Sequence, residues 1–218
     1  MKIKKILCYI LTFLPLVVTM IALPFLPEQI PAHYGMDNQV TRWGSKYEAL
    51  IVPAITIVFG IFMLMLTKYT AKKEKDGKNN EKATLTAAII ALVIFNALSF
   101  FFLYTDFNKI ENLSLIPLNI DRLTFAGWGI LMIILGNVMP KLRMNSIIGL
   151  RTKWSMKNET AWKKSQFCGG ISFIAAGVII LIICILAKNI DYLMWVTGIL
   201  AVLIVIDVWM TYKIAQKY

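Results

Sequence analysis

The chain has 218 residues, of which 58% are hydrophobic and only 16% are charged, whereas soluble domains carry about 45–50% apolar and about 25% charged residues. Its apolar residues are gathered into long blocks, which excludes an ordinary soluble domain. The formal net charge of +11 does not predict direct nucleic-acid binding, because the Lys and Arg residues lie in short stretches between the apolar blocks.

Six apolar blocks predict six transmembrane helices. They cover residues 6–26, 49–67, 83–105, 123–139, 168–187 and 192–212. At about 1.5 Å per residue each block reaches roughly 25–35 Å, which matches a hydrocarbon core of about 30 Å. The first block follows three lysines, like a secretory signal peptide, but it is too long and has no small-residue cleavage site, so we expect an uncleaved span. The expected fold is an all-α polytopic bundle with the lipid bilayer as its partner.

The distribution of basic residues predicts the orientation of the spans. If the N-terminus is cytosolic, 18 of the 23 Lys and Arg residues lie in cytosolic segments and 5 lie in outer ones. Cytosolic loops carry the excess of Lys and Arg in membrane proteins. We therefore expect both termini in the cytosol, which agrees with an even number of spans.

Residues 1–68 form the first predicted unit, which has two spans and an outer loop. The loop contains His33, Gly35 and Trp43 among several turn-forming Pro and Gly residues and shows no apolar periodicity. His33 is the one histidine of the chain, so a site with several histidines is excluded. A general base or metal ligand is the sharper interpretation of His33, and a solvated histidine in a turn is the simpler one.

Residues 69–82 are rich in Lys and Asn and predict a solvated cytosolic linker. The remaining unit, residues 83–218, holds four spans and an inner loop at residues 140–165. The three cysteines lie in or beside apolar blocks, in no disulfide or metal-binding pattern. No catalytic or nucleotide-binding motif is present, so the sequence predicts neither an enzyme nor a cofactor.

The inner loop combines a turn former, a cation and two amphipathic aromatic residues. These include Asn145, Gly149, Arg151, Thr152, Trp154 and Trp162. One interpretation is an interfacial helix from about residue 156, with the two tryptophans at headgroup depth. The other is a recognition surface for a cytosolic partner.

Asp207 is an acid placed inside the sixth apolar block. A charge in hydrocarbon is expensive and is usually paired or exposed to a water-filled cavity, so Asp207 is a candidate functional residue. The simpler interpretation is that its side chain reaches the inner headgroups or pairs with a basic residue of the inner loop. Both interpretations stand at the level of sequence.

The loop NSIIGLRTKWSMKNETAWKKSQFCGG resembles the signature of the SdpI family of bacterial immunity proteins. In that signature an asparagine precedes I-G-x-R-T, a tryptophan follows, and W-x-K comes later. The matching positions are Asn145, Ile148, Gly149, Arg151, Thr152, Trp154, Trp162 and Lys164. Lys153 departs from the pattern, since the family often has proline there. The outer loop resembles the domain of unknown function that accompanies this family, through Pro27, Ile30, Pro31, His33, Gly35, Gly44 and Lys46.

The resemblance implies a multi-pass protein of the bacterial plasma membrane that protects its producer from a secreted, membrane-active peptide toxin. It also implies that toxin sensing can lead the membrane protein to hold a cytosolic transcriptional repressor at the membrane. The outer-loop residues are then candidate toxin contacts, and the inner-loop residues are candidate partner contacts. Two other functions stand beside this one: a small proton- or cation-coupled transporter or exporter that uses Asp207, and a housekeeping role in the envelope.

Overall fold

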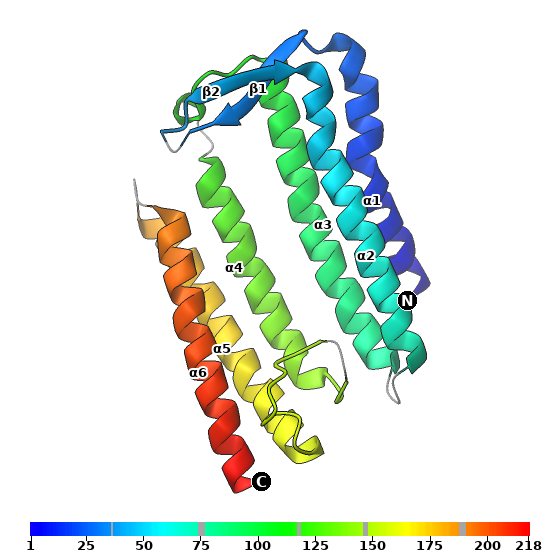
Figure 1. Ribbon diagram of the computed structural model, residues 1–218, viewed down its shortest axis with the longest axis vertical. Helices are drawn as coiled ribbons and strands as arrows, with labels where there is room; N and C mark the ends of the chain where they lie inside the picture. The colour runs from blue at the N-terminus through cyan, green and yellow to red at the C-terminus, as the bar shows by residue number, and fades with distance from the viewer. Residues whose placement is uncertain (36, 74–76, 117–118, 146–147, 188–190) are drawn as a thin grey trace. The chain divides into compact units, whose positions relative to one another are not determined.

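The computed structural model describes residues 1–35, 37–73, 77–116, 119–145, 148–187 and 191–218 (Figure 1). Its long helices are α1 (Lys2–Ala22), α2 (Ile51–Lys73), α3 (Gly77–Phe107), α4 (Ile120–Val138), α5 (Glu159–Leu186) and α6 (Tyr192–Lys217). Six helices in the described ranges are long and apolar enough to cross a membrane. The predicted polytopic helical bundle is confirmed, and the chain is a multi-pass membrane protein.

The helix ends differ from the predicted ends where capping residues or polar turns extend a helix. α5 begins nine residues before the predicted apolar block, because the Asn158 side chain accepts a hydrogen bond from the backbone N–H of Ala161 at 2.8 Å. Asp191 caps α6 in the same way through Met194 at 3.0 Å. α2 and α3 both run into the segment expected to be a linker. The predicted division of the chain at residues 69–82 stays a prediction.

The outer loop contains a β-hairpin that the sequence did not predict. β1 (Gln29–Tyr34) pairs antiparallel with β2 (Val40–Ser45), with Ile30 opposite Gly44. Proline and glycine disfavour strands, and Pro31 is tolerated here because both strands of a two-stranded sheet are edges. Ile30 is 2% exposed, so one face of the hairpin is buried.

The hairpin pairs with the segment that follows α3. Val40 donates to Glu111 O, and Leu113 donates to Asn38 O, both at 2.9 Å. The Tyr34 hydroxyl donates to Ile110 O at 2.8 Å. The two segments joined here are the loops expected on the outer side of the membrane, so their contact agrees with the predicted order of spans.

The chain forms two compact units. One comprises residues 1–65 and 88–120, and the other comprises residues 66–87 and 121–218. In the first unit the hairpin lies at the ends of α1 and α2 (Figure 1). Within the helices of this unit, the Asn96 amide of α3 donates to Leu11 O of α1 at 2.8 Å. This is a polar contact between apolar helices.

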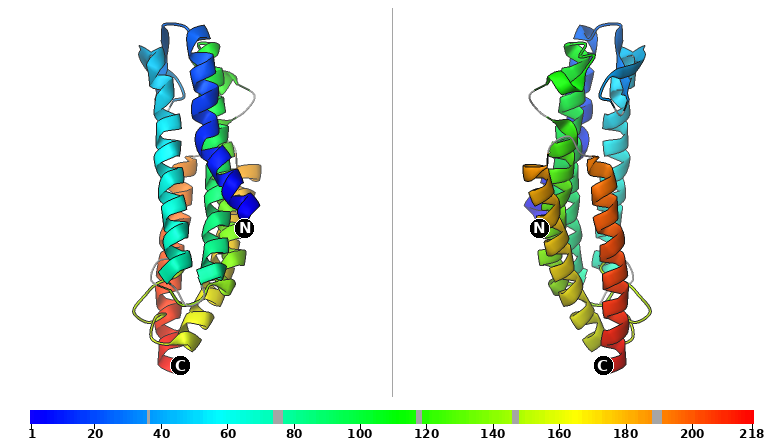
Figure 2. Two further views of the ribbon diagram at one scale, coloured as in Figure 1. Left: turned by 90° about the vertical axis from the view of Figure 1, so that its right-hand side faces the viewer. Right: turned by 90° about the vertical axis from the view of Figure 1, so that its left-hand side faces the viewer.

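Helices α5 and α6 of the second unit run antiparallel and side by side (Figures 1 and 2). Their core includes Ile180, Val196 and Leu203. α4 packs on α5 through two reciprocal glycine pairs, Gly136 with Gly170 and Gly129 with Gly177. A Cβ atom on either Gly136 or Gly177 would lie 2.5 Å from the carbonyl oxygen of its partner. Only glycine permits such a close backbone approach.

Candidate functional sites

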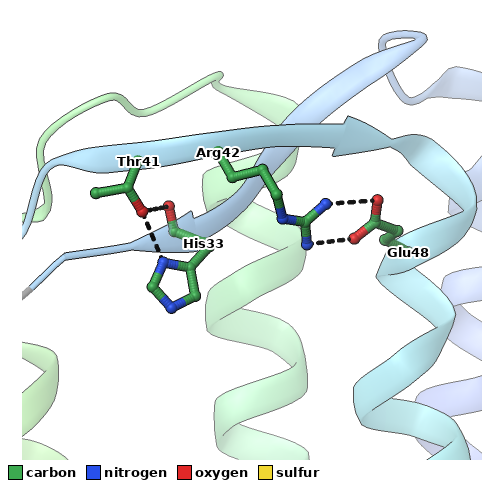
Figure 3. Close-up of polar contacts among 4 residues, drawn as sticks. All are labelled: His33, Thr41, Arg42 and Glu48. Atoms are coloured by element: carbon green, nitrogen blue, oxygen red, sulfur yellow. Dashed lines mark hydrogen bonds and ion pairs between the residues drawn. The ribbon is translucent and has the colours of Figure 1, made fainter.

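Two side-chain contacts stabilise the outer hairpin (Figure 3). One joins its two strands, and the other joins β2 to the short helix that follows it. His33 Nδ1 of β1 lies 2.6 Å from the Thr41 hydroxyl of β2. Arg42 binds Glu48 of η2 (Lys46–Leu50) with two hydrogen bonds of 3.0 and 2.7 Å. This contact with Glu48 raises the pKa of Arg42 above its ordinary value.

The acids around His33 are engaged elsewhere. Glu28 forms an ion pair with Lys46 at 2.8 Å, and Asp37 accepts from Gln39 N at 3.2 Å. With Glu48 held by Arg42, no acid gathers with His33 in the described ranges. The described residues also contain no group of three His, Cys, Asp or Glu that could hold a metal ion.

The three candidate toxin-contact residues belong to this one hairpin. His33 is exposed, and Gly35 closes the turn by donating its N–H to Gln39 O at 2.8 Å. Trp43 is 39% exposed and lies opposite Pro31. Tyr47, one turn beyond β2, is 62% exposed and was missed at the level of sequence. The hairpin and the η2 turn that follows it therefore expose an imidazole and two aromatic side chains.

The inner loop folds around buried side-chain amides. Asn145 is 3% exposed; its amide donates to Arg143 O and Ile148 O, and its oxygen accepts from Ile148 N at 2.7 Å. Gly149 has a φ of 105°, which L side chains rarely adopt. These two motif residues set the path of the backbone.

Gln166, which sequence reasoning missed, holds the next residue of the loop. Its side chain is fully buried, accepts from Leu150 N and donates to Leu150 O, both at 2.9 Å. A Cβ atom on Gly149 would lie 2.6 Å from Gln166 Oε1. One feature of the sequence could have identified Gln166: it is a neutral amide near the start of an apolar helix. A buried amide requires hydrogen-bond partners, so such a residue is expected to bind the backbone of a neighbouring segment.

Two motif residues contact the C-terminal part of α6. The Thr152 hydroxyl donates to Thr211 at 3.0 Å. The Trp154 ring packs edge-on against Tyr212 with the ring centroids 5.4 Å apart. The inner loop and the end of α6 therefore lie on the same side of the membrane, as the order of spans predicts.

Trp162 does not lie at a lipid interface. It is 1% exposed, packs with Met139 and Leu142, and donates from Nε1 to Leu142 O at 2.9 Å. The expected interfacial helix from about residue 156 is therefore wrong at this position, because the capped start of α5 is continuous with the span and directs Trp162 inward.

Arg151 differs from the other motif residues. Its side chain is exposed, and its guanidinium has no hydrogen-bond or ion-pair partner in the described part of the chain. Lys153, the departure from the family pattern, is also exposed, and its ammonium lies 5.1 Å from the Trp154 ring centroid. Of the six candidate residues in this loop, Arg151 is the one with an exposed side chain that has no hydrogen-bond or ion-pair partner in the described part of the chain.

Asp207 is buried within the second unit. It is 1% exposed, its Oδ1 accepts from the Ser172 hydroxyl at 2.5 Å, and its Oδ2 has no hydrogen-bond partner among the described residues. Its described partner is a serine of α5 rather than a basic residue of the inner loop. The side chain thus joins α5 to α6 through one hydrogen bond.

Comparison with known proteins gives two family matches and two relatives. Residues 141–212 match the SdpI/YfhL protein family, and residues 10–57 match a domain of unknown function, DUF1648. The protein named "Immunity protein SdpI" of Bacillus subtilis (strain 168) is 25% identical over 202 residues, which cover 93% of this chain and 91% of that protein.

An "Uncharacterized protein" of Archaeoglobus fulgidus is 40% identical over 43 residues, which cover 20% of this chain and 24% of that protein. No solved structure matches the chain. The resemblance inferred from the inner-loop motif is confirmed: residues 141–212 match the SdpI/YfhL family, and residues 10–57, earlier in the chain, match DUF1648.

Proposed function

We propose that this chain is a membrane immunity protein that protects its producer from a secreted, membrane-active peptide toxin. The observation that carries the proposal is the similarity to the Bacillus subtilis relative named an immunity protein, which extends over 93% of this chain and 91% of that protein. Because both regions of the chain are included, the similarity supports a shared role more strongly than a match to one loop.

The outer hairpin is the proposed toxin contact. An amphipathic peptide in the outer leaflet would meet exposed aromatic residues there, and Trp43 and Tyr47 offer apolar faces with polar edges. Strand pairing fixes the hairpin backbone before binding, which reduces the ordering cost of association. Toxin bound in this way is removed from the free pool by mass action.

A challenge experiment tests the immunity function. The chain is expressed in a sensitive bacterium, its membrane level is measured by immunoblot, and the cells are exposed to a membrane-active killing peptide. We expect increased survival, and loss of that protection in Trp43→Ala at normal membrane level. Trp195→Ala, at the start of α6 and 51% exposed, is the matched control and keeps protection. Absence of protection by the wild-type chain at full membrane level contradicts the proposal.

We propose further that Arg151 contacts a cytosolic transcriptional repressor in the toxin-bound state. The five other motif residues are used within the fold, so a partner would meet Arg151. Toxin must bind one helix arrangement better than another to change this contact. In cells that carry such a repressor, we expect toxin to move it to the membrane fraction with the wild-type chain and with Lys213→Ala, but not with Arg151→Ala. Equal retention by Arg151→Ala contradicts this role.

A proton- or cation-coupled transporter is the second candidate function. It is favoured by one observation, the buried Asp207 carboxylate with an unpartnered oxygen in a membrane span. Flux of protons or monovalent cations into proteoliposomes distinguishes it from immunity. Flux that Asp207→Asn abolishes supports transport, and wild-type proteoliposomes that match empty vesicles contradict it.

A further inference from the structure

A basic pocket lies in the second unit, beside the inner loop. It has a volume of about 610 Å³, within the range of small-molecule sites. Nine described residues line it, of which four are cations and none is an acid. The cations are Lys82, Lys141, Arg143 and Lys163, and the apolar wall includes Val138 and Leu142.

The pocket lies at the ends of three membrane spans. Lys82 is near the start of the span Asn80–Phe107, Lys141 ends the span Arg122–Lys141, and Lys163 is near the start of the span Glu159–Leu186. The charge asymmetry of the chain predicts that all three ends are cytosolic. We therefore expect the cations at the depth of the lipid phosphates of the inner leaflet, with the apolar wall of the pocket beside them.

Buried side chains fix one wall of the pocket. The backbone N–H of Arg143 donates to Asn80 Oδ1 at 3.3 Å, and Leu142 O accepts from Trp162 Nε1 at 2.9 Å. Asn80 is fully buried and Trp162 is 1% exposed. The segment that carries Leu142 and Arg143 is thus held in place from the protein interior, and one of its supports is a residue of the family motif.

We propose that this pocket binds the phosphate-bearing headgroup of an anionic phospholipid. The cations contact the phosphate oxygens, and the apolar wall contacts the glycerol backbone and the first methylenes of an acyl chain. Basic pockets between transmembrane helices on the cytosolic side bind such headgroups. Four cations around one cavity can contact both phosphates of a two-phosphate headgroup, so cardiolipin binds more tightly than phosphatidylglycerol, which has one.

The test compares two variants with the same change in net charge. Lys82→Gln/Lys141→Gln/Lys163→Gln removes three pocket cations. Lys2→Gln/Lys68→Gln/Lys213→Gln removes three exposed lysines that do not line the pocket and that are also predicted to be cytosolic. Each full-length protein is purified in detergent and titrated with cardiolipin, phosphatidylcholine or inorganic phosphate, and binding is measured by native mass spectrometry and by the thermal midpoint.

We expect cardiolipin, but not phosphatidylcholine, to bind the wild-type chain and raise its thermal midpoint. The pocket variant lowers the cardiolipin affinity about 100-fold, since each Lys near anionic lipid contributes about 1 kcal/mol. The control variant lowers it less than about threefold, because none of its three lysines lines the pocket and salt screens exposed charges. Thr86→Phe narrows the pocket and keeps every cation. We expect it to weaken cardiolipin binding as well, which tests the pocket without a change in net charge.

Three outcomes overturn the proposal. Equal losses in the two triple variants show general surface attraction rather than a site. A response to inorganic phosphate as large as the response to cardiolipin identifies a soluble anion as the ligand. Full cardiolipin affinity in both the pocket variant and Thr86→Phe shows that the lipid binds elsewhere.

Discussion

The outer hairpin and the inner loop are both polar segments between membrane spans, but different interactions hold them. In the hairpin, a strand ladder sets the backbone, and charged pairs such as Arg42 and Glu48 remain 55% and 29% exposed. In the inner loop, neutral amides and hydroxyls of buried residues such as Asn145, Ser155 and Gln166 bond to the backbone.

The difference shows where each segment tolerates change. Exposed ion pairs contribute little to stability, because water and salt screen them. A buried polar group that loses its partner costs about 1–3 kcal/mol. The outer hairpin can therefore exchange surface side chains and keep its fold, whereas in the inner loop a substitution at a buried position such as Asn145 or Gln166 removes hydrogen bonds to the backbone.

The largest expected effect tests this contrast with one residue type. Trp162→Ala removes a buried indole and leaves Leu142 O without its donor, so we expect a loss of about 3–5 kcal/mol in the free energy of unfolding. Trp43→Ala, at a position 39% exposed, should cost less than about 1 kcal/mol. Thermal midpoints in detergent and membrane levels measure both. Equal losses would break the comparison.

A matched pair of glycines gives the next effect. Gly149→Ala forces a side chain onto a φ of 105° and against Gln166, and we expect it to cost about 1–3 kcal/mol. In Gly35→Ala the new methyl would meet Asp37 Oδ1 at 2.7 Å, the end of a flexible side chain that can move, so the cost is smaller. A lower thermal midpoint for Gly35→Ala than for Gly149→Ala contradicts this order.

Tyr34 provides a pH-dependent test of the hairpin. Burial raises the pKa of Tyr34 above its ordinary value, so folding favours the neutral phenol that donates to Ile110 O. Its contribution is present below the unfolded pKa of roughly 10 and is lost as the pH rises through the higher folded pKa. Tyr34→Phe should cost about 1 kcal/mol at pH 8 and abolish this extra loss above roughly pH 10. An unchanged alkaline profile in the variant excludes Tyr34 as its source.

The smallest effect is expected at the exposed ion pair of the hairpin. Arg42→Gln removes both hydrogen bonds to Glu48, yet we expect no measurable change in the thermal midpoint at about 0.15 M salt. Glu48→Gln should behave the same way. A clear decrease in either variant would show that the hairpin depends on its ion pair and that the contrast with the inner loop is weaker than the geometry indicates.

The six helices could be predicted because hydrocarbon requires long apolar blocks whatever the details of packing. Their ends could not be predicted as well. α5 starts after the cap residue Asn158, which lies outside its apolar block. Hydropathy averaged over many residues does not detect the effect of a single capping residue. The hairpin was missed because Pro31 and Gly44 are poor strand residues, and pairing with residues 111–113 lies far along the sequence.

The candidate sites were predictable as segments but not as individual roles. The motif pointed to the region that matches the SdpI/YfhL family, yet the sequence did not distinguish the exposed Arg151 from the buried Trp162. For Gln166 the sequence offered one signal, a neutral amide near the start of an apolar helix, but its two bonds to Leu150 exist only after the loop folds back. Asp207 was identified from its setting, but its partner, Ser172, required the packing of α5 on α6.

The reciprocal glycine pairs between α4 and α5 have a mechanical consequence. The two glycines of each helix are seven residues apart. The carbonyl oxygens of one helix therefore lie against the glycines of the other at both contacts. Sliding one helix along the other would drive those oxygens into larger side chains. A methyl group added at Gly198 of α6, by contrast, would meet no atom within 4 Å. Within this unit, the two glycine pairs therefore hold α4 and α5 in one register, and Gly198 of α6 takes no part in such a contact.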